Sequence, residues 1–286
     1  GKAVEIELMT TKGCYRIAKE LVIRRVFQKD GVSLPSANIV FEKNLDNYGN
    51  VTDITISGIV FSNPAAGLKT MIDAGSAYVY VPNLLQVGNY PENTCLGANI
   101  HIDYNSAENA NWGTSGYLTA TLNSDPQVFS QWRATPITSA ADTTGMIENE
   151  IPLTFAFQQS AFSNYVRGWM IFASGAKIGS KQNVEWTMKY PQELKVEELN
   201  GKRCYNFYIR ATASGDNTGA SGQSVINGWY VKTALDRIDA TEKAAGNQSY
   251  YLKFNYVTSI DANTNKLTWK SDLAQMAVSS NTNNKQ

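Results

Sequence analysis

Residues 194–209 read LKVEELNGKRCYNFYI, and this stretch decides the fold class. From Tyr205 to Ile209, apolar and polar side chains alternate, which is the period-two pattern of a half-buried β-strand. The Asn200–Gly201 pair before it readily supplies the two positive φ angles of a type I′ turn. The stretch therefore predicts an antiparallel hairpin that places one face in a core.

The same alternation recurs towards both ends of the chain, at 4–8 and 252–256. A second hairpin is predicted to turn at 263–265, between a strand at 250–260 and another at 267–269. These segments favour a protein built mainly from β-strands.

Few segments have a helical pattern. The best runs from Val231 to Ala245, is rich in helix formers, and is followed by Gly246, a residue type that commonly ends helices. Shorter helical turns are predicted at 66–74 and 127–132. The helices are therefore expected to be connectors in a sheet protein.

The periodicity lapses between Ser124 and Asn149 and returns at Ile151. Because 286 residues suffice for two ordinary domains, we predict an N-terminal β-domain over 1–147 and a C-terminal β-domain over 148–286.

Two segments are predicted to lie outside the strands. The Gly-, Ser- and Asn-rich run at 214–224 is expected to be a long exposed loop, and the polar tail after Ala277 is expected to be poorly ordered.

Composition excludes some classes of partner. Lys plus Arg and Asp plus Glu each total 25, so no long-range field attracts nucleic acid or an anionic membrane. No stretch approaches the roughly 20 apolar residues of a membrane-spanning helix, and an export signal removed before Gly1 would leave no trace. Cys14, Cys95 and Cys204 form no CxxC pair, which favours buried free thiols over a disulfide framework.

Catalytic chemistry has little support in the sequence. His101 is the single histidine, so a histidine-based zinc site is excluded and a Ser-His-Asp triad would depend on His101 alone. Asp103 is its potential partner on the same strand face, but no Gly-x-Ser-x-Gly segment accompanies the pair. We expect His101 to be structural.

Glycosidase chemistry needs only two carboxyl groups that flank a sugar bond. The candidate pairs are Asp103 with Glu108, Glu148 with Glu150, and Glu197 with Glu198. Adjacent carboxylates are usually solvated, and the calcium-loop resemblance of 261–266 lacks the required Gly and Glu, which favours an Asx turn there. We therefore expect no catalytic residue, no cofactor and no metal.

Aromatic residues offer a binding alternative. Trp112 and Tyr117, within NANWGTSGY at 109–117, are the candidates for stacking on a sugar. Most other aromatic residues, such as Trp169 and Trp186, alternate into sheet cores, and for Trp112 a binding role and a packing role both stay open.

Three segments near the start occur in a fixed order: RIAK at 16–19, ITISGIVFSNP at 54–64 with Gly67 soon after, and YVYVPN at 78–83. This order resembles the Bacteroidales fimbrillins, the surface pilus and adhesin subunits of that bacterial group. The resemblance covers about the first third of the chain.

The resemblance implies two transthyretin-like β-sandwich domains, export as a lipoprotein precursor, and a fimbrium at the cell surface or outer membrane. It also implies assembly by β-strand exchange, with other fimbrial subunits as partners and a host protein or glycan as a further one. In this chain Val4, Ile6 and Leu8 are the candidate strand-exchange residues; the alternative is an ordinary first strand within its own sheet.

We therefore expect an all-β protein of two β-sandwich domains with a few short helical connectors. Its expected function is that of a structural or adhesive fimbrial subunit and not of an enzyme, with no nucleic acid partner and membrane contact only through the precursor's lipid anchor. The alternative is a secreted carbohydrate-binding, lectin-like module, and a two-carboxylate enzyme comes third.

Overall fold

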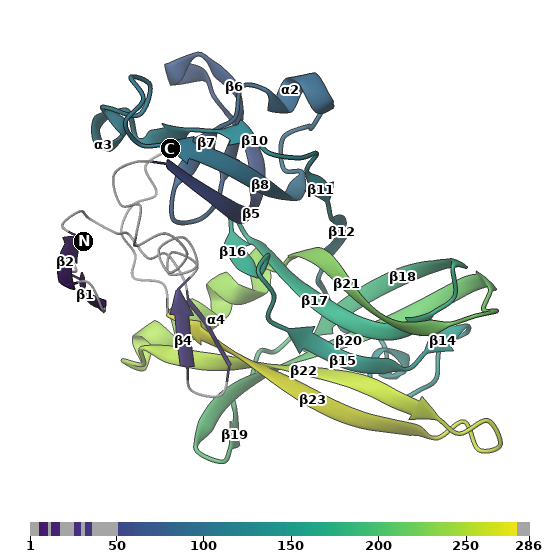
Figure 1. The fold of residues 1–286 in the computed structure, drawn as a ribbon. Helices are drawn as coiled ribbons and strands as arrows, with labels where there is room; N and C mark the ends of the chain where they lie inside the picture. The colour runs from purple at the N-terminus through teal and green to yellow at the C-terminus, as the bar shows by residue number, and fades with distance from the viewer. Residues whose placement is uncertain (1–5, 11–12, 18–25, 30–31, 36–50, 279–286) are drawn as a thin grey trace.

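A computed structural model of the chain describes residues 6–10, 13–17, 26–29, 32–35 and 51–278 (Figure 1). They form a barrel, drawn in blue at the top of Figure 1, and a larger two-sheet unit, drawn in green and yellow below it. A separate hairpin pairs β1 (Ile6–Thr10) with β2 (Gly13–Ile17).

The barrel is formed by one sheet whose strand order is β10-β8-β5-β6-β7-β9, with β11 also paired to β8. Its strands are β5 (Val51–Asn63), β6 (Leu68–Asp73), β7 (Tyr78–Tyr80), β8 (Cys95–Asp103), β9 (Tyr117–Thr119), β10 (Thr121–Leu122) and β11 (Gln127–Val128). Only Ala120 separates β9 from β10. Because this one segment pairs with β7 at one end of the sheet and with β8 at the other, the sheet closes on itself.

Alternation along these strands fills the barrel with aliphatic side chains. The interior cluster consists of Ile54, Ile56, Val60, Ile72, Ala74, Val79, Val81, Leu84, Leu96, Ala98, Ile100, Ile102, Leu118 and Ala120. Short helical turns join the strands: η2 (Pro64–Ala66), α2 (Leu84–Val87) and α3 (Trp112–Ser115).

The larger unit packs two sheets face to face. The five-stranded sheet contains β12 (Ser130–Arg133), β15 (Leu153–Gln158), β16 (Asn164–Val166), β17 (Trp169–Ile178) and β21 (Ser221–Tyr230). The nine-stranded sheet contains β3 (Val26–Lys29), β4 (Val32–Pro35), β13 (Thr135–Pro136), β14 (Glu150–Ile151), β18 (Lys181–Tyr190), β19 (Glu197–Leu199), β20 (Lys202–Asp216), β22 (Ser249–Ile260) and β23 (Leu267–Ala277).

Aromatic side chains fill the space between the two sheets. The Phe254 ring of β22 lies 5.2 Å from the Phe172 ring of β17 and 5.6 Å from that of Phe157 of β15, measured between centroids. Trp229, from β21, is fully buried in the same cluster. This core belongs to strands that are far apart in the sequence.

Helix α4 (Lys232–Ala244) is fixed to the nine-stranded sheet by a buried carboxylate. Glu242 accepts two hydrogen bonds of 2.9 Å from Arg203, and others from the Tyr205 hydroxyl and Asn247. Burial acts to raise the pKa of Glu242, but these hydrogen bonds outweigh it and lower that pKa. Glu242 is therefore a charged anchor.

A second buried ion pair holds the segment that contains η3 (Ala140–Asp142). Arg210 of β20 is 3% exposed and donates to both carboxylate oxygens of Glu150, at 2.6 and 2.5 Å. Its terminal nitrogens also donate to the carbonyls of Ala141 and Gly145, each at 2.6 Å. Glu150 is thus buried and paired, contrary to the expectation of a solvated carboxylate.

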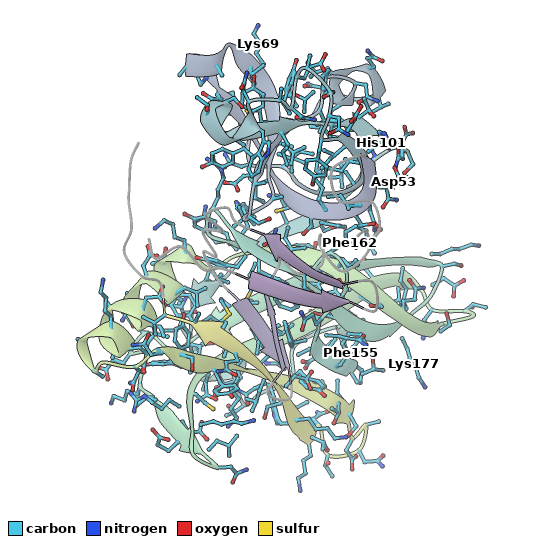
Figure 2. The ribbon with its side chains drawn as sticks, turned by 60° about the vertical axis from the view of Figure 1, so that its left-hand side comes forward. Asp53, Lys69, His101, Phe155, Phe162 and Lys177 are labelled. Atoms are coloured by element: carbon cyan, nitrogen blue, oxygen red, sulfur yellow. The ribbon has the colours of Figure 1, made fainter. Side chains whose placement is uncertain are left out.

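Three side chains of the β16–β17 region join the barrel to the two-sheet unit. The Asn164 amide, 4% exposed, donates to the carbonyls of Ser57 and Ala74 at 2.8 and 3.0 Å. Arg167 donates to Asp73 at 2.9 Å. Phe162 lies at the junction in Figure 2, where a Cβ added to Gly97 would approach its ring to 2.5 Å.

The local sequence predictions are confirmed. The Asn200–Gly201 turn has φ values of 50° and 73°, and it joins β19 to β20. β22 and β23 form the second hairpin, and α4 lies within the predicted helix. Cys95 and Cys204 are buried free thiols, and burial raises the pKa of Cys95 to about 12. Cys14 lies in β2, and its side chain is outside the described part of the structure.

Three segment predictions are wrong. Residues 66–74 mostly form strand β6 and 127–132 form β11 and part of β12, because strand pairing overrides local helix propensity. The predicted loop at 214–224 is exposed, but only 217–220 lie between the paired strands β20 and β21. Of the predicted tail, only Val278 is described, and its backbone nitrogen donates to the Gln248 carbonyl at 2.9 Å.

The all-β expectation is confirmed, whereas two transthyretin-like sandwiches are not: residues 51–122 close into a barrel. β12 and β13 precede the predicted boundary at 147/148 but pair with β21 and β18 of the two-sheet unit. Strand pairing alone does not define an independently folding domain, so that boundary stays a prediction.

Replacing Gly58 by alanine should destabilise the barrel. A Cβ there would lie 2.3 Å from the Asp73 carbonyl oxygen, so β5 and β6 would have to separate. We expect a loss of about 1–3 kcal/mol in the free energy of unfolding, measured with urea. Gly113→Ala is the control, because no atom lies within 4 Å of its added Cβ. Equal midpoints for the two variants would contradict the close approach.

Candidate ligand-binding face of the barrel

Strands β5, β7 and β9 carry aromatic side chains on the outside of the barrel. Val79 and Leu118 point into the barrel core, so their neighbours Tyr78, Tyr80 and Tyr117 point outward. In the strand register Tyr78 lies opposite Tyr117. All three tyrosines are partly exposed.

Ring contacts connect these side chains. The rings of Tyr80 and Tyr117 meet edge to face with centroids 6.3 Å apart, and those of Phe61 and Tyr78 are 4.9 Å apart. Within the described residues, neither the Tyr80 nor the Tyr117 hydroxyl has a hydrogen-bonding partner. We call Phe61, Tyr78, Tyr80 and Tyr117 the aromatic face. Phe61 is buried beneath it, whereas the partly exposed tyrosines offer ring surface to a ligand, and Tyr80 and Tyr117 also offer their hydroxyls.

The barrel sequence carries more acidic than basic residues. Residues 49–126 contain six carboxylates, no arginine and one lysine, Lys69, which stands at the top of the barrel in Figure 2. Binding of a nucleic acid depends on neutralising phosphates with Lys and Arg. The barrel by itself is therefore poorly suited to a nucleic acid.

The two predicted glycan-binding residues occupy different surroundings. Tyr117 belongs to the aromatic face, whereas Trp112, in α3, is partly buried against the barrel core. Nothing in the structure tests glycan binding. Tyr78 and Tyr80 were missed, although the YVY alternation at 78–80 indicates two side chains on one strand face.

The predicted strand-exchange residues are described only in part. Val4 lies outside the described residues, whereas Ile6 and Leu8 belong to β1 and lie opposite Ile17 and Tyr15 of β2. Strand exchange and the alternative of an ordinary first strand within its own sheet both stay open.

His101 lies on β8 and pairs with a residue other than the predicted Asp103. Its Nδ1 lies 2.9 Å from Asp53 Oδ1, and the two are neighbours in Figure 2. Asp53 also accepts a hydrogen bond from Asn123, and the Asn123 and His101 hydrogen bonds lower the pKa of Asp53. The cross-strand register, with Asp53 opposite His101, explains this pair.

The candidate carboxylates have other roles. Asp103 accepts from the Asn105 backbone, Glu197 pairs with Lys253, and Glu198 pairs with Arg203, while Glu108 and Glu148 are exposed. Asp261 accepts from the backbone nitrogens of Asn263 and Thr264, which confirms the Asx turn. The described part of the chain contains no group of three or more His, Cys, Asp or Glu residues that could hold a metal ion.

Comparison with known proteins identifies the barrel. Residues 49–126 match a family model described as a lipoprotein OB domain. The order and closure of the barrel strands agree with an OB-fold, a partly open Greek-key barrel. The comparison with curated proteins gives no match.

Two solved structures share the wider fold. A crystal structure of an uncharacterized protein from Parabacteroides merdae has a TM-score of 0.64 at 20% identity, covering 79% of this chain and all of that one. A candidate lipoprotein from Bacteroides fragilis has a TM-score of 0.50 at 11% identity, covering 77% of this chain and 96% of that one. A fimbrillin relationship is not shown. Among the described helices, none is long and apolar enough to cross a membrane.

Replacing His101 by alanine should leave ligand binding unchanged and lower stability only slightly, because its hydrogen bond to Asp53 is solvent-exposed. Unfolding midpoints and binding isotherms of the variant and the wild type measure both effects. Loss of a specific catalytic turnover in a folded variant would instead show that His101 is catalytic.

Proposed function

We propose that this chain is a non-enzymatic, exported binding protein whose OB barrel holds a neutral oligosaccharide on its aromatic face. The observation that carries the proposal is the set of ring surfaces on β7 and β9, together with the Tyr80 and Tyr117 hydroxyls, for which no described residue provides a hydrogen-bonding partner. Tyr78 and Tyr80 stand about 7 Å apart along β7, and Tyr117 lies on the neighbouring strand about 4.8 Å away. The area covered by these three rings suits an oligosaccharide better than a single sugar.

The fold and the charge support this ligand class. OB-folds bind oligonucleotides and oligosaccharides on the face of their second and third strands, which are β6 and β7 here. Six carboxylates against a single lysine in residues 49–126 disfavour the oligonucleotide. Saccharides stack on aromatic rings and need no basic patch.

Location at the cell surface belongs to the same proposal. The matched family is described as a lipoprotein domain, and the Bacteroides fragilis structure is of a candidate lipoprotein. A lipid anchor on the precursor would hold the barrel at the membrane, where it meets external glycans.

The double variant Tyr80→Ala, Tyr117→Ala should bind oligosaccharide at least about tenfold more weakly than the wild type, because stacking surface and two hydroxyls are removed. Titration calorimetry with chitotetraose, maltotetraose and laminaritetraose measures the change. Tyr251→Ala is the matched control, because Tyr251 lies on β22 in the two-sheet unit. Absence of binding to every oligosaccharide by the wild type, or equal affinities for all three proteins, would contradict the proposal.

Assembly into a fimbrium by strand exchange is a second proposal, favoured by one observation. β3 pairs with β23 only at Gln275 and Met276, so among the described strands none pairs with the outer edge of β23 over 267–274. An open edge can accept a donated strand from another subunit.

Deleting residues 1–9 tests this second proposal. The deletion removes the apolar positions Val4, Ile6 and Leu8. If this strand is donated to a neighbouring subunit, the deletion should abolish polymers. If the strand instead occupies the acceptor edge of its own subunit, the deletion should promote polymers. Light scattering sizes both proteins at concentrations where the full chain assembles. Identical size distributions would contradict strand exchange through this terminus.

A further inference from the structure

We infer that Arg167, which belongs to the two-sheet unit, completes the binding face of the barrel and donates hydrogen bonds to neighbouring hydroxyl or acetamido oxygens of a neutral sugar. This inference rests on the proposed function, and it names the side chain that would recognise the oxygens of the neutral oligosaccharide.

A tight turn carries Arg167 to the barrel. Arg167 and Gly168 connect β16 to β17 with φ values of 51° and 84°, both in the left-handed region. A non-glycine residue in that region is uncommon, and here it aims the side chain across the junction between the two units. The barrel sequence at 49–126 has no arginine of its own.

The guanidinium is held on two sides. Its Cζ lies 4.1 Å from the centre of the Phe61 ring, and its Nε donates to Asp73 Oδ2 at 2.9 Å. The Asp73 side chain is only 1% exposed, so this partner is itself fixed. Arg167 therefore loses little further freedom when a ligand binds.

The outer edge of the guanidinium remains available. The Arg167 side chain is 37% exposed, and within the described residues Nη1 and Nη2 form no hydrogen bond. Phe61 lies against Tyr78 at 4.9 Å, so this donor edge adjoins the aromatic face. Two donors beside ring surfaces form a site for a pair of neighbouring sugar oxygens.

Charge decides which sugar fits. The Asp73 carboxylate already compensates the guanidinium charge, and the surrounding barrel is acidic. A carboxylate on the ligand would gain less from this compensated guanidinium than from a free one, and it would meet the repulsion of the acidic barrel. A neutral oxygen acceptor gains the hydrogen bonds without that repulsion.

The test uses Arg167→Gln and Arg167→Lys in the full chain, with Arg133→Gln as the matched control. Arg133 also stacks on a ring, that of Tyr230 at 4.3 Å, but it lies in the two-sheet unit away from the aromatic face. The probes are chitotetraose, maltotetraose and laminaritetraose, together with tetragalacturonate and its methyl ester. Unfolding midpoints are measured alongside, and Arg167→Lys keeps a cation beside Asp73 if the glutamine variant does not fold.

Both Arg167 variants should bind the preferred neutral oligosaccharide about tenfold more weakly, while the Arg133 variant binds as the wild type does. Wild-type affinity should not depend on salt, and the methyl ester should bind more tightly than the acid. Unchanged affinity in the folded Arg167 variants, or tighter and salt-sensitive binding of the acid, would overturn the inference. If the double variant Tyr80→Ala, Tyr117→Ala loses binding while the Arg167 variants keep it, the inference about Arg167 fails and the proposed function stands. If no oligosaccharide binds the wild type, both fail.

Discussion

The side-chain amide of Asn164 sets the arrangement of the whole molecule, because it is the buried group through which the two-sheet unit holds the backbone of the barrel. Both hydrogens of its Nδ2 are used, one on the Ser57 carbonyl and one on the Ala74 carbonyl. Without them, two carbonyls of the barrel would be buried and unsatisfied, at a cost of about 1–3 kcal/mol each. The position of Arg167, three residues further along, follows from this anchor.

Packing around Asn164 reinforces the same arrangement. A small apolar cluster joins Ile59 and Cys95 of the barrel to Phe129, Val166 and Ile171. Glycines allow the close approach: a Cβ on Gly228 would lie 2.6 Å from the Cys95 sulfur. The two buried ion pairs act at other places, with Glu242 fixing α4 and Arg210 fixing the segment before β14. Buried charges are costly unless fully hydrogen-bonded, and both are, so each specifies one position for its segment.

The sequence predicts the local structure well because hairpins and helices depend on near neighbours. The turn at Asn200–Gly201, the β22–β23 hairpin and the end of α4 near Gly246 each need only a few adjacent residues. Closure of the barrel could not be predicted, because it depends on Ala120 separating two short pairings with strands far away in the sequence. Of the aromatic face, the sequence indicated only Tyr117. Strand register places Tyr78 beside Tyr117, and Phe61 lies beside Tyr78, so local sequence could not assign either of them to the face. Arg167 could not be predicted as a binding residue, because the local sequence of its turn does not indicate which surface the side chain will contact.

The connection from the barrel into the two-sheet unit has a mechanical consequence. After the barrel, β12 pairs in parallel with β21 of one sheet, and two residues later β13 pairs in parallel with β18 of the other. Tension along β12 acts parallel to the strand and loads its ladder of hydrogen bonds together, in shear, instead of opening them one at a time. A protein tethered at a surface and pulled through a bound ligand would therefore resist separation of its two halves more strongly than one whose halves were joined by an unpaired linker.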